Sequence, residues 1–448
     1  MSVEELIKQR QQQYLEKETH QDKNTQDMED KKSEIYNRVR HRISENRDLF
    51  VNQDLQYIRN NLWKIIEDEM EANRSEWMLT SYERAEVLEL IMHTMFGYGI
   101  LEPLIHDSTI TEIMVNGLDK IYIEKNGSLI QAKDRQGKPL KFNKNEELMH
   151  VIEKIVSPIN RKINESDPIV DARLPNGSRV NVVLYPIALD GSTLTIRKFP
   201  EKPYTMKQLI GFETLSQELA DLLEILVKAR YNIIISGGTG SGKTTFLNAL
   251  SMFIPAQSRL ITIEDAAELK LSMAENLIRL ETRPPNMEGK GEIKMRDLLK
   301  TALRMRPDRI IVGEVRGGEA LDMLQAMNTG HDGSLSTGHA NTALDMLSRL
   351  ETMVLMAGLE LPLSAIRQQI TSAVDFIVHL SKMRDGKRRV VEIVEVLGVN
   401  NQSIEIQSIY KWDESRGSLL PTGIPIQSMD KWTAAGYPHP IMNPIERR

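Results

Sequence analysis

A glycine-rich segment at residues 237–244 carries the clearest chemistry in the sequence. It reads GGTGSGKT and matches G-x-x-x-x-G-K-[ST] at every fixed position, the pattern of a loop that wraps the phosphates of a nucleoside triphosphate. Lys243 is expected to reach the β- and γ-phosphates, and the Thr244 hydroxyl to ligate Mg²⁺. We therefore predict ATP and Mg²⁺ as ligands. The predicted nucleotide-binding residues here are Gly238, Thr239, Gly240, Ser241, Gly242, Lys243, Thr244 and Thr245.

The segments on either side of this loop have the order that phosphate binding requires. Residues 231–236 are a short apolar run rich in β-branched side chains, typical of a strand buried on both faces. After the loop, a helix is expected to continue through Phe253 and to end before Pro255. Its N-terminus would point at the phosphates. The alternative is a glycine-rich turn that lies beside a lysine and binds nothing.

A pair of acidic residues, Glu264 and Asp265, follows the expected strand 259–263. Ligand sites in α/β sheets lie beyond the carboxyl ends of the strands. Adjacent acids cannot share one direction, so we expect one to face Mg²⁺ and water while the other holds the loop. We assign the chemistry, and with Thr244 the metal ligation, to Glu264. The alternative is an acidic helix cap.

A second acid, Glu314, follows the expected strand 309–312. This segment is similar to a Walker B strand, except that Gly313 stands where common phosphate-loop enzymes have an aspartate. Because that metal ligand is missing, Thr244, water and Glu264 would complete the Mg²⁺ shell. Glu314 is then the best general base or water-orienting group, and a purely structural glutamate is the alternative.

His339 follows another expected strand, 334–337, and so falls on the same edge of the sheet. We interpret it as a sensor of the γ-phosphate, although a solitary histidine is more often structural. His331 lies eight residues earlier, but a metal site built on two histidines lacks further ligands at suitable spacing. No metal other than Mg²⁺ is expected.

Several arginines are candidates for contacts with the phosphates. Arg283 lies in the same region as the acids and the histidine, whereas Arg173, Arg179 and Arg197 lie on strand and turn edges before the loop. These three can reach phosphates across a domain or subunit boundary, as arginine fingers do. The alternative for each arginine is ordinary surface charge.

The surrounding elements predict three structural regions. Residues 1–75 are polar and suggest a helical, partly disordered N-terminal region, and residues 76–200 mix strand, hairpin and helix signals in the manner of an α+β domain. Within that domain, apolar spacing predicts a helix over 148–156 that begins near Asn143 with Glu146 behind it. A linker is expected at 201–212.

Residues 213–448 form the third region and contain the phosphate-binding loop. Strands alternate with helical segments there, which favours a mainly parallel α/β sheet. Further strands at 376–379, 390–394 and 403–406 are expected to extend the sheet, and beyond Trp412 the pattern fades into a C-terminal tail.

Composition limits the class of protein. The chain has 448 residues, 40% of them hydrophobic, and no cysteine, which is enough for several cores and excludes disulfides and thiolate chemistry. The net charge of -6 with 5% aromatic residues gives no basic field, so an obligate nucleic-acid partner is not expected. No apolar run approaches the length of a membrane span and the N-terminus is not that of a signal peptide, so we expect a cytoplasmic protein.

The ordered set of motifs resembles the secretion ATPase superfamily of type II and type IV systems. Walker A, the Asp box, Walker B and the His box correspond to 237–245, 262–265, 304–316 and 336–341. Within that group, residues 281–286, 288–291 and 324–335 are most similar to CpaF-like motor ATPases of tight-adherence pili. The resemblance covers roughly residues 95–400; the tetracysteine zinc element of many type II members is absent.

The resemblance implies a RecA-like phosphate-loop ATPase domain preceded by a PAS-like α+β domain and a helical region. In this superfamily a glycine is usual at the position of Gly313. It further implies a homohexamer with ATP bound at clefts between subunits or domains. The arginines expected to close over the nucleotide match Arg173, Arg179 and Arg197. The implied partners are inner-membrane platform proteins. The expected place of action is the inner face of the cytoplasmic membrane.

The leading functional hypothesis is an ATP-hydrolysing hexameric motor for pilus assembly or protein secretion, driven by nucleotide-dependent domain motions. One alternative is a DNA-translocating or conjugation-type ATPase, which would need basic grooves interleaved with aromatic residues. Another alternative is a scaffold that is switched by nucleotide binding and does not hydrolyse the nucleotide. The presence of Glu264, Glu314 and His339 argues against it.

Overall fold

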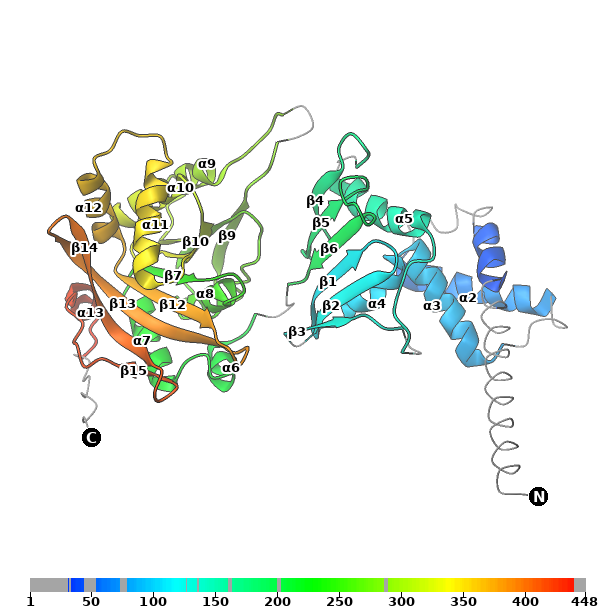
Figure 1. Ribbon diagram of the computed structural model, residues 1–448, viewed down its shortest axis with the longest axis horizontal. Helices are drawn as coiled ribbons and strands as arrows, with labels where there is room; N and C mark the ends of the chain where they lie inside the picture. Colours follow the sequence, from blue (N-terminus) through cyan, green and yellow to red (C-terminus); the bar gives the residue numbers. More distant parts are fainter. Residues whose placement is uncertain are drawn as a thin grey trace, which may run out of the picture. The chain divides into compact units, whose positions relative to one another are not determined.

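The chain divides into two compact units, Met1–Lys198 and Phe199–Arg448, and each is described by itself. The computed structural model describes residues 31, 34–43, 54–72, 79–125, 127–134, 137–159, 163–199, 203–285 and 289–438 (Figure 1). The beginning of the predicted N-terminal helical region and the end of the predicted C-terminal tail lie outside these residues.

A small group of helices opens the first unit. Helical residues 34–43 pack with α2 (Leu55–Ala72) and α3 (Ser81–Met95) through one apolar cluster. The hydroxyl of Thr80 accepts a hydrogen bond from the backbone N–H of Glu83, and the Glu83 carboxylate accepts one from the backbone of Thr80, so a capping box starts α3. The buried residues include Ile35, Val39, Leu62, Ile66, Val87 and Ile91.

An antiparallel sheet of six strands follows in the order β3-β2-β1-β6-β5-β4. Along its strands buried and exposed residues alternate, so one face packs on the core and the other faces outward. The strands are β1 (Ile110–Asn116), β2 (Lys120–Lys125), β3 (Ser128–Gln131), β4 (Ile169–Arg173), β5 (Arg179–Val183) and β6 (Thr193–Arg197). The helices are η2 (Gly99–Leu101), α4 (Glu102–His106), α5 (Asn145–Val156) and η3 (Ser157–Ile159).

Helix α5 covers the buried face of this sheet with the predicted apolar residues of 148–156. Its predicted start was wrong in detail. The N-cap is Lys144, whose side chain makes no capping bond, and it is Glu147, not Glu146, that accepts a hydrogen bond from the backbone N–H of Asn143 at 3.1 Å. The helix begins one residue too late for the pair Asn143 and Glu146 to cap it.

A nine-stranded sheet forms the second unit, in the order β15-β14-β13-β12-β7-β11-β10-β8-β9. The strands from β12 to β9 in this order are parallel to one another, which confirms the predicted α/β class, and β13, β14 and β15 extend the sheet antiparallel. The strands are β7 (Ile233–Gly237), β8 (Arg259–Glu264), β9 (Asn276–Glu281), β10 (Arg309–Val315), β11 (Leu335–His339), β12 (Phe376–Lys382), β13 (Arg388–Asn400), β14 (Ser403–Asp413) and β15 (Ser418–Pro421).

Helices cover both faces of this sheet (Figure 1). On β7, Ile233 and Ile235 belong to the core with α7 and α8, whereas Ile234 belongs to the opposite core with α9 to α12. A strand buried on both faces is therefore apolar at every position, as the sequence predicts. The helices are α6 (Met206–Gly211), α7 (Gln217–Lys228), α8 (Lys243–Ser251), α9 (Met295–Ala302), α10 (Glu319–Asn328), α11 (Ala343–Leu355), α12 (Leu363–Ala373) and α13 (Asp430–Ala434).

Candidate functional site

The glycine-rich loop joins the end of β7 to the start of α8 in the middle of the sheet. Its first residue, Gly237, pairs with His339 of β11 and with Leu380 of β12. A Cβ atom added to Gly237 would lie 2.4 Å from the Leu380 carbonyl oxygen, so only glycine fits between these strands. Gly242, directly before α8, has φ +93°, a left-handed conformation that glycine adopts without strain.

The hydroxyl residues of the loop lie in different surroundings. Thr239 lines a cavity described below, and Thr244 and Thr245 lie in the first turn of α8. Ser241 is buried, and among the described residues its Oγ has no hydrogen-bond partner. A buried hydroxyl in this condition is suited to a ligand that supplies an acceptor.

Lys243 lies folded against the loop that precedes it. Its Nζ donates hydrogen bonds to the carbonyl oxygens of Gly237 at 3.0 Å and Gly238 at 2.9 Å, and lies 3.2 Å from Nδ1 of His339. The side chain is buried. The ammonium group is thus held at the loop by weak, exchangeable acceptors, which the phosphates of a nucleotide can replace.

Glu314 and His339 meet at the carboxyl ends of the neighbouring strands β10 and β11. Oε1 of Glu314 lies 2.8 Å from Nε2 of His339, in an electrostatic contact that is not an aligned hydrogen bond. Oε2 of Glu314 accepts a hydrogen bond from Arg316 at 2.6 Å. The structure therefore brings Lys243, His339 and Glu314 into one continuous chain of contacts.

The protonation of His339 follows from its two neighbours. An ammonium group can only donate, so Nδ1 of His339 accepts from Lys243 and the ring proton is on Nε2, toward Glu314. Burial lowers the pKa of His339 from its ordinary value, opposed by the charge of Glu314 and reinforced by that of Lys243. The ring is therefore neutral near pH 7.

Glu264 divides its two oxygens between different environments. Oε2 accepts hydrogen bonds from the backbone N–H groups of Glu268 at 2.8 Å and Leu269 at 2.9 Å, so it holds the following loop. Oε1 is buried and has no hydrogen-bond partner among the described residues. Burial raises the pKa of this carboxyl to about 7, although the two backbone bonds lower it. Asp265, by contrast, is exposed.

Gly313 leaves room for Glu264. A Cβ atom at residue 313 would lie 2.9 Å from Cγ of Glu264 and 3.6 Å from its Oε2. The carboxylate of Glu264 thus occupies the space that an aspartate at residue 313 would need. Because carboxylate and hydroxyl oxygens are the ligands that Mg²⁺ prefers, the unpartnered Oε1 of Glu264 fits the predicted metal-binding role.

The arginines divide between several places. Arg283 is exposed, forms a β-bridge with Ile293 and donates from Nε to the carbonyl oxygen of Gly291 at 2.7 Å. Its hydrogen bond within the described residues thus goes to its own loop, not to residues 237–244. Arg316, beside Glu314, is exposed as well.

In the first unit, the three predicted arginines form a row across neighbouring strands. Arg173 of β4 pairs with Arg179 of β5, and Arg179 pairs with Arg197 of β6; Glu112 of β1 is the next residue along. All lie on the sheet face opposite the core. Like charges at directly opposed positions are unfavourable, so this row is suited to an anion.

Arg388 is a candidate that the sequence analysis missed. It begins β13, is exposed, and donates from Nε to the carbonyl oxygen of Gly240 at 2.8 Å. Its Cδ would lie 3.3 Å from a Cβ added to Gly242, so its stem covers the loop. The only sequence signal is the basic run 387–389 after a turn, and basic runs are usually solvated.

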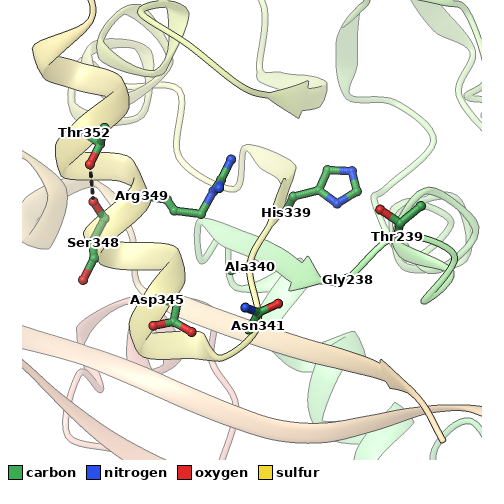
Figure 2. A pocket seen from close by; sticks show the side chains of 9 residues that line it. All are labelled: Gly238, Thr239, His339, Ala340, Asn341, Asp345, Ser348, Arg349 and Thr352. Atoms are coloured by element: carbon green, nitrogen blue, oxygen red, sulfur yellow. Dashed lines mark hydrogen bonds between the residues drawn. The ribbon is translucent and has the colours of Figure 1, made fainter.

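A polar cavity of about 460 Å³ lies beside the loop (Figure 2). Helix α11 supplies one wall and the first residues of the loop, with the end of β11, supply the other. The lining residues are Gly238, Thr239, His339, Ala340, Asn341, Asp345, Ser348, Arg349 and Thr352. The sequence analysis named the loop residues and, within the His box, His339, Ala340 and Asn341, but it did not single out the residues of α11.

Comparison with known proteins shows extended similarity. The family described as type II/IV secretion system protein matches residues 95–410. A putative conjugal transfer protein of Mycobacterium tuberculosis is 32% identical over 346 residues, 76% of this chain and 95% of that protein. The conjugal transfer protein TrbB of Rhizobium radiobacter is 34% identical over 311 residues, 69% of this chain and 90% of that one.

The chain is also similar to a protein of solved structure. The VirB11 ATPase of the Brucella suis type IV secretion system is 30% identical, with a TM-score of 0.36 over 65% of this chain and 92% of that one. In the part of this chain that the structure describes, no helix is both long enough and apolar enough to cross a membrane.

Proposed function

The chain is an ATPase that belongs to the type II/IV secretion system protein family, and we propose that Lys243, Glu264, Glu314 and His339 form its hydrolytic centre. It is a motor that serves secretion or pilus function. The observation that carries the assignment of residues is the chain of contacts from Lys243 through His339 to Glu314, at the mouth of the loop of residues 237–244.

Each side chain has a distinct part in hydrolysis. Lys243 exchanges the carbonyl oxygens of Gly237 and Gly238 for phosphate oxygens of ATP, and the loop N–H groups surround the remaining phosphates. Glu314, fixed by Arg316, accepts the proton of the attacking water. The neutral His339 donates from Nε2 and is placed to sense the γ-phosphate. Thr244 and Glu264 would hold Mg²⁺, which would supply neutralisation of the phosphate charge when bound.

The arginine row of the first unit supplies a second set of cations. In this proposal Arg173, Arg179 and Arg197, together with Arg283, approach the nucleotide when the domain of residues 76–200 moves against the motor domain of residues 213–448 about the linker 201–212. The arrangement of subunits in the proposed ring determines which of these arginines contact a nucleotide bound to the neighbouring subunit. The adjacent positions of the three arginines support a shared anionic ligand.

The finer identity that the sequence motifs support is a CpaF-like motor of a tight-adherence pilus. In this proposal the chain is a homohexamer that works at the inner face of the cytoplasmic membrane with the platform proteins of a pilus or secretion system, and nucleic acid is not an obligate partner. Sedimentation of the full-length protein with and without ATP measures the oligomeric state.

A conjugation-type or DNA-translocating ATPase is the second candidate, and one observation favours it: two relatives with 32% and 34% identity are described as conjugal transfer proteins. Hydrolysis that is stimulated by DNA at physiological salt would support it. Hydrolysis that is indifferent to DNA supports the pilus or secretion motor.

Turnover and nucleotide binding of two variants test the assignment. Lys243→Ala and Glu314→Ala are both expected to abolish steady-state hydrolysis, whereas ATP binding survives better in Glu314→Ala because only the lysine contacts ground-state phosphates. Arg416→Ala is the control, because Arg416 is exposed and, within the described part of the chain, makes its ion pair and its backbone hydrogen bond with Asp413 of its own turn. Wild-type turnover in either of the first two variants would remove that residue from the centre.

A further inference from the structure

The cavity beside the phosphate loop is lined by one face of α11. Its helical residues Asp345, Ser348, Arg349 and Thr352 are spaced by three and four positions, which places them on one side of a helix. The opposite wall contains Thr239 of the loop and His339. One space therefore joins the predicted γ-phosphate sensor to a polar helix face that hydrolysis as described above does not use.

Arg349 supplies the positive charge of this space, whose lining also contains the carboxylate of Asp345. Arg349 is exposed, and no carboxylate in the described part of the chain forms an ion pair with it. Figure 2 shows its side chain extending from α11 toward the side where His339 lies, whereas Asp345 lies nearer the start of the helix. Its charge acts on His339, lowering the pKa of that ring. The cation is thus directed at the phosphate end of the cavity.

The hydroxyl groups of the helix face can also accept or donate to a ligand. Thr352 Oγ1 donates to the carbonyl oxygen of Ser348 at 3.1 Å, and Ser348 Oγ donates weakly to that of Leu344 at 3.5 Å. Both oxygens keep acceptor capacity, and the Ser348 hydroxyl can rotate away from its long bond. A guanidinium with neighbouring hydroxyl groups is a set that binds a tetrahedral oxyanion.

We propose that this cavity is a subsite for inorganic phosphate, in which Arg349 binds the ion that hydrolysis releases. The inference rests on the proposed ATPase centre. When water attacks, the bond from the γ-phosphorus to its bridging oxygen breaks, and the phosphate that leaves lies between the loop and His339. A volume of about 460 Å³ holds that ion with several waters, each of which takes about 30 Å³ in the liquid. The phosphate thus moves sideways past His339 while ADP stays on the loop.

Titration of inorganic phosphate into the ADP complex of the full chain tests this subsite. Arg349→Gln and Arg349→Ala are expected to weaken phosphate binding by about three- to tenfold, the effect of removing one charged contact from a partly exposed site. Arg349→Lys retains part of the affinity, because the charge remains but the planar fork does not. Product inhibition of ATP hydrolysis by phosphate is expected to weaken in parallel.

Arg416→Ala is the matched control, since it removes an exposed arginine far along the chain in the turn between β14 and β15. Thermal unfolding of every variant checks that α11 is intact. Equal phosphate affinity in Arg349→Gln and the wild type, or equal weakening in Arg416→Ala, overturns the subsite and leaves the ATPase assignment untouched. Failure of the wild type to cleave ATP in a single turnover removes the proposed centre, whereas phosphate binding that depends on Arg349 would still be measured.

Discussion

Glu264 and Gly313 share one space at the carboxyl ends of β8 and β10, where a Cβ atom on Gly313 would lie 2.9 Å from Cγ of Glu264. These strands are parallel neighbours, with Ile263 paired to Val312. The carboxylate at the end of β8 thus takes the place that a side chain on residue 313 of β10 would occupy. Residue 313 is therefore a glycine, in place of the aspartate of the common Walker B pattern, because any side chain there would collide with Glu264.

Filling this space is expected to destabilise the second unit. Gly313→Ala forces Glu264 to shift and is predicted to lower the free energy of unfolding by about 1–3 kcal/mol, as overpacked cores do. Gly313→Asp is predicted to be worse, because it adds a second carboxylate beside a buried one. Urea denaturation measures both effects.

Gly398→Ala provides the comparison, since it also lies in a strand but an added Cβ there meets nothing within 4 Å. It is expected to leave the urea midpoint nearly unchanged. Equal midpoints for Gly313→Ala and Gly398→Ala would show that Glu264 can leave its place without loss.

The buried carboxyl of Glu264 is expected to make stability depend on pH. Its pKa is raised from 4.5 to about 7, so the folded state binds the proton more tightly than the unfolded chain does. The resulting stabilisation is complete below pH 4.5 and is lost as the pH rises to about 7, by about 3 kcal/mol at 1.4 kcal/mol per unit. Glu264→Gln, which cannot ionise, is predicted to remove this loss.

Urea denaturation of both proteins between about pH 5 and pH 8, without nucleotide or Mg²⁺, measures that difference. Burial also lowers the pKa of His379 and raises that of Asp375, but both groups are present in both proteins and cancel. A free-energy difference between the two proteins that stays constant over the range would mean that Glu264 keeps an ordinary pKa.

The pH dependence of hydrolysis is expected to report on His339. Burial lowers its pKa below 6.5, so the neutral ring persists at pH 7 and accepts from Lys243. Protonation makes Nδ1 a donor, which breaks the contact with Lys243 and strengthens the hold on Glu314, so kcat/KM falls on the acid side. His339→Gln is predicted to remove this inflection and to slow hydrolysis by about 10²-fold or more.

His331→Gln serves as the control for this profile, because His331 contacts the carbonyl oxygen of Ala326 at the end of α10 and not the site. Its acid inflection should match that of the wild type. If His339→Gln kept the inflection, the titrating group would have to be another residue.

The convergence of Glu264, Glu314 and His339 on one edge was predictable from the sequence. Glu264 and Glu314 follow apolar β-branched runs, and His339 follows the expected strand 334–337. The carboxyl ends of the parallel strands β8, β10 and β11 meet at that edge. The surroundings of the Glu264 carboxylate were not predictable, because they depend on which of its oxygens finds backbone donors and on the space at Gly313.

The cations next to the loop depend on features that periodicity does not reveal. Arg388 reaches Gly240 because β13 returns antiparallel beside β12 after a short turn, and short connections between strands produce antiparallel pairs where helices would produce parallel ones. Arg349 faces the cavity because of the rotation of α11 about its axis. Strand β9 also escaped prediction, since its edge position leaves several of its residues exposed.

The contact of Arg388 with the loop is expected to support nucleotide binding. Its Nε bonds the Gly240 carbonyl oxygen at 2.8 Å, which restrains the loop and places a cation beside the bound phosphates. Arg388→Ala is predicted to raise KM for ATP by about three- to tenfold, the effect of losing one charge-assisted hydrogen bond at an exposed position. Arg388→Lys keeps the charge but loses that directed hydrogen bond, so its KM for ATP is expected to lie between those of the wild type and Arg388→Ala.

The neighbouring Arg389 makes a matched control. It pairs with Asp385 and Glu213 and lies over the ring of Trp412, so Arg389→Ala is expected to lower the melting temperature while KM for ATP stays near the wild-type value. Steady-state kinetics and thermal unfolding on the same preparations separate the two roles. An unchanged KM in Arg388→Ala would show that the hydrogen bond to Gly240 has no effect on nucleotide binding. A residue that restrains the conformation of the phosphate loop is expected to change the affinity of the loop for phosphate.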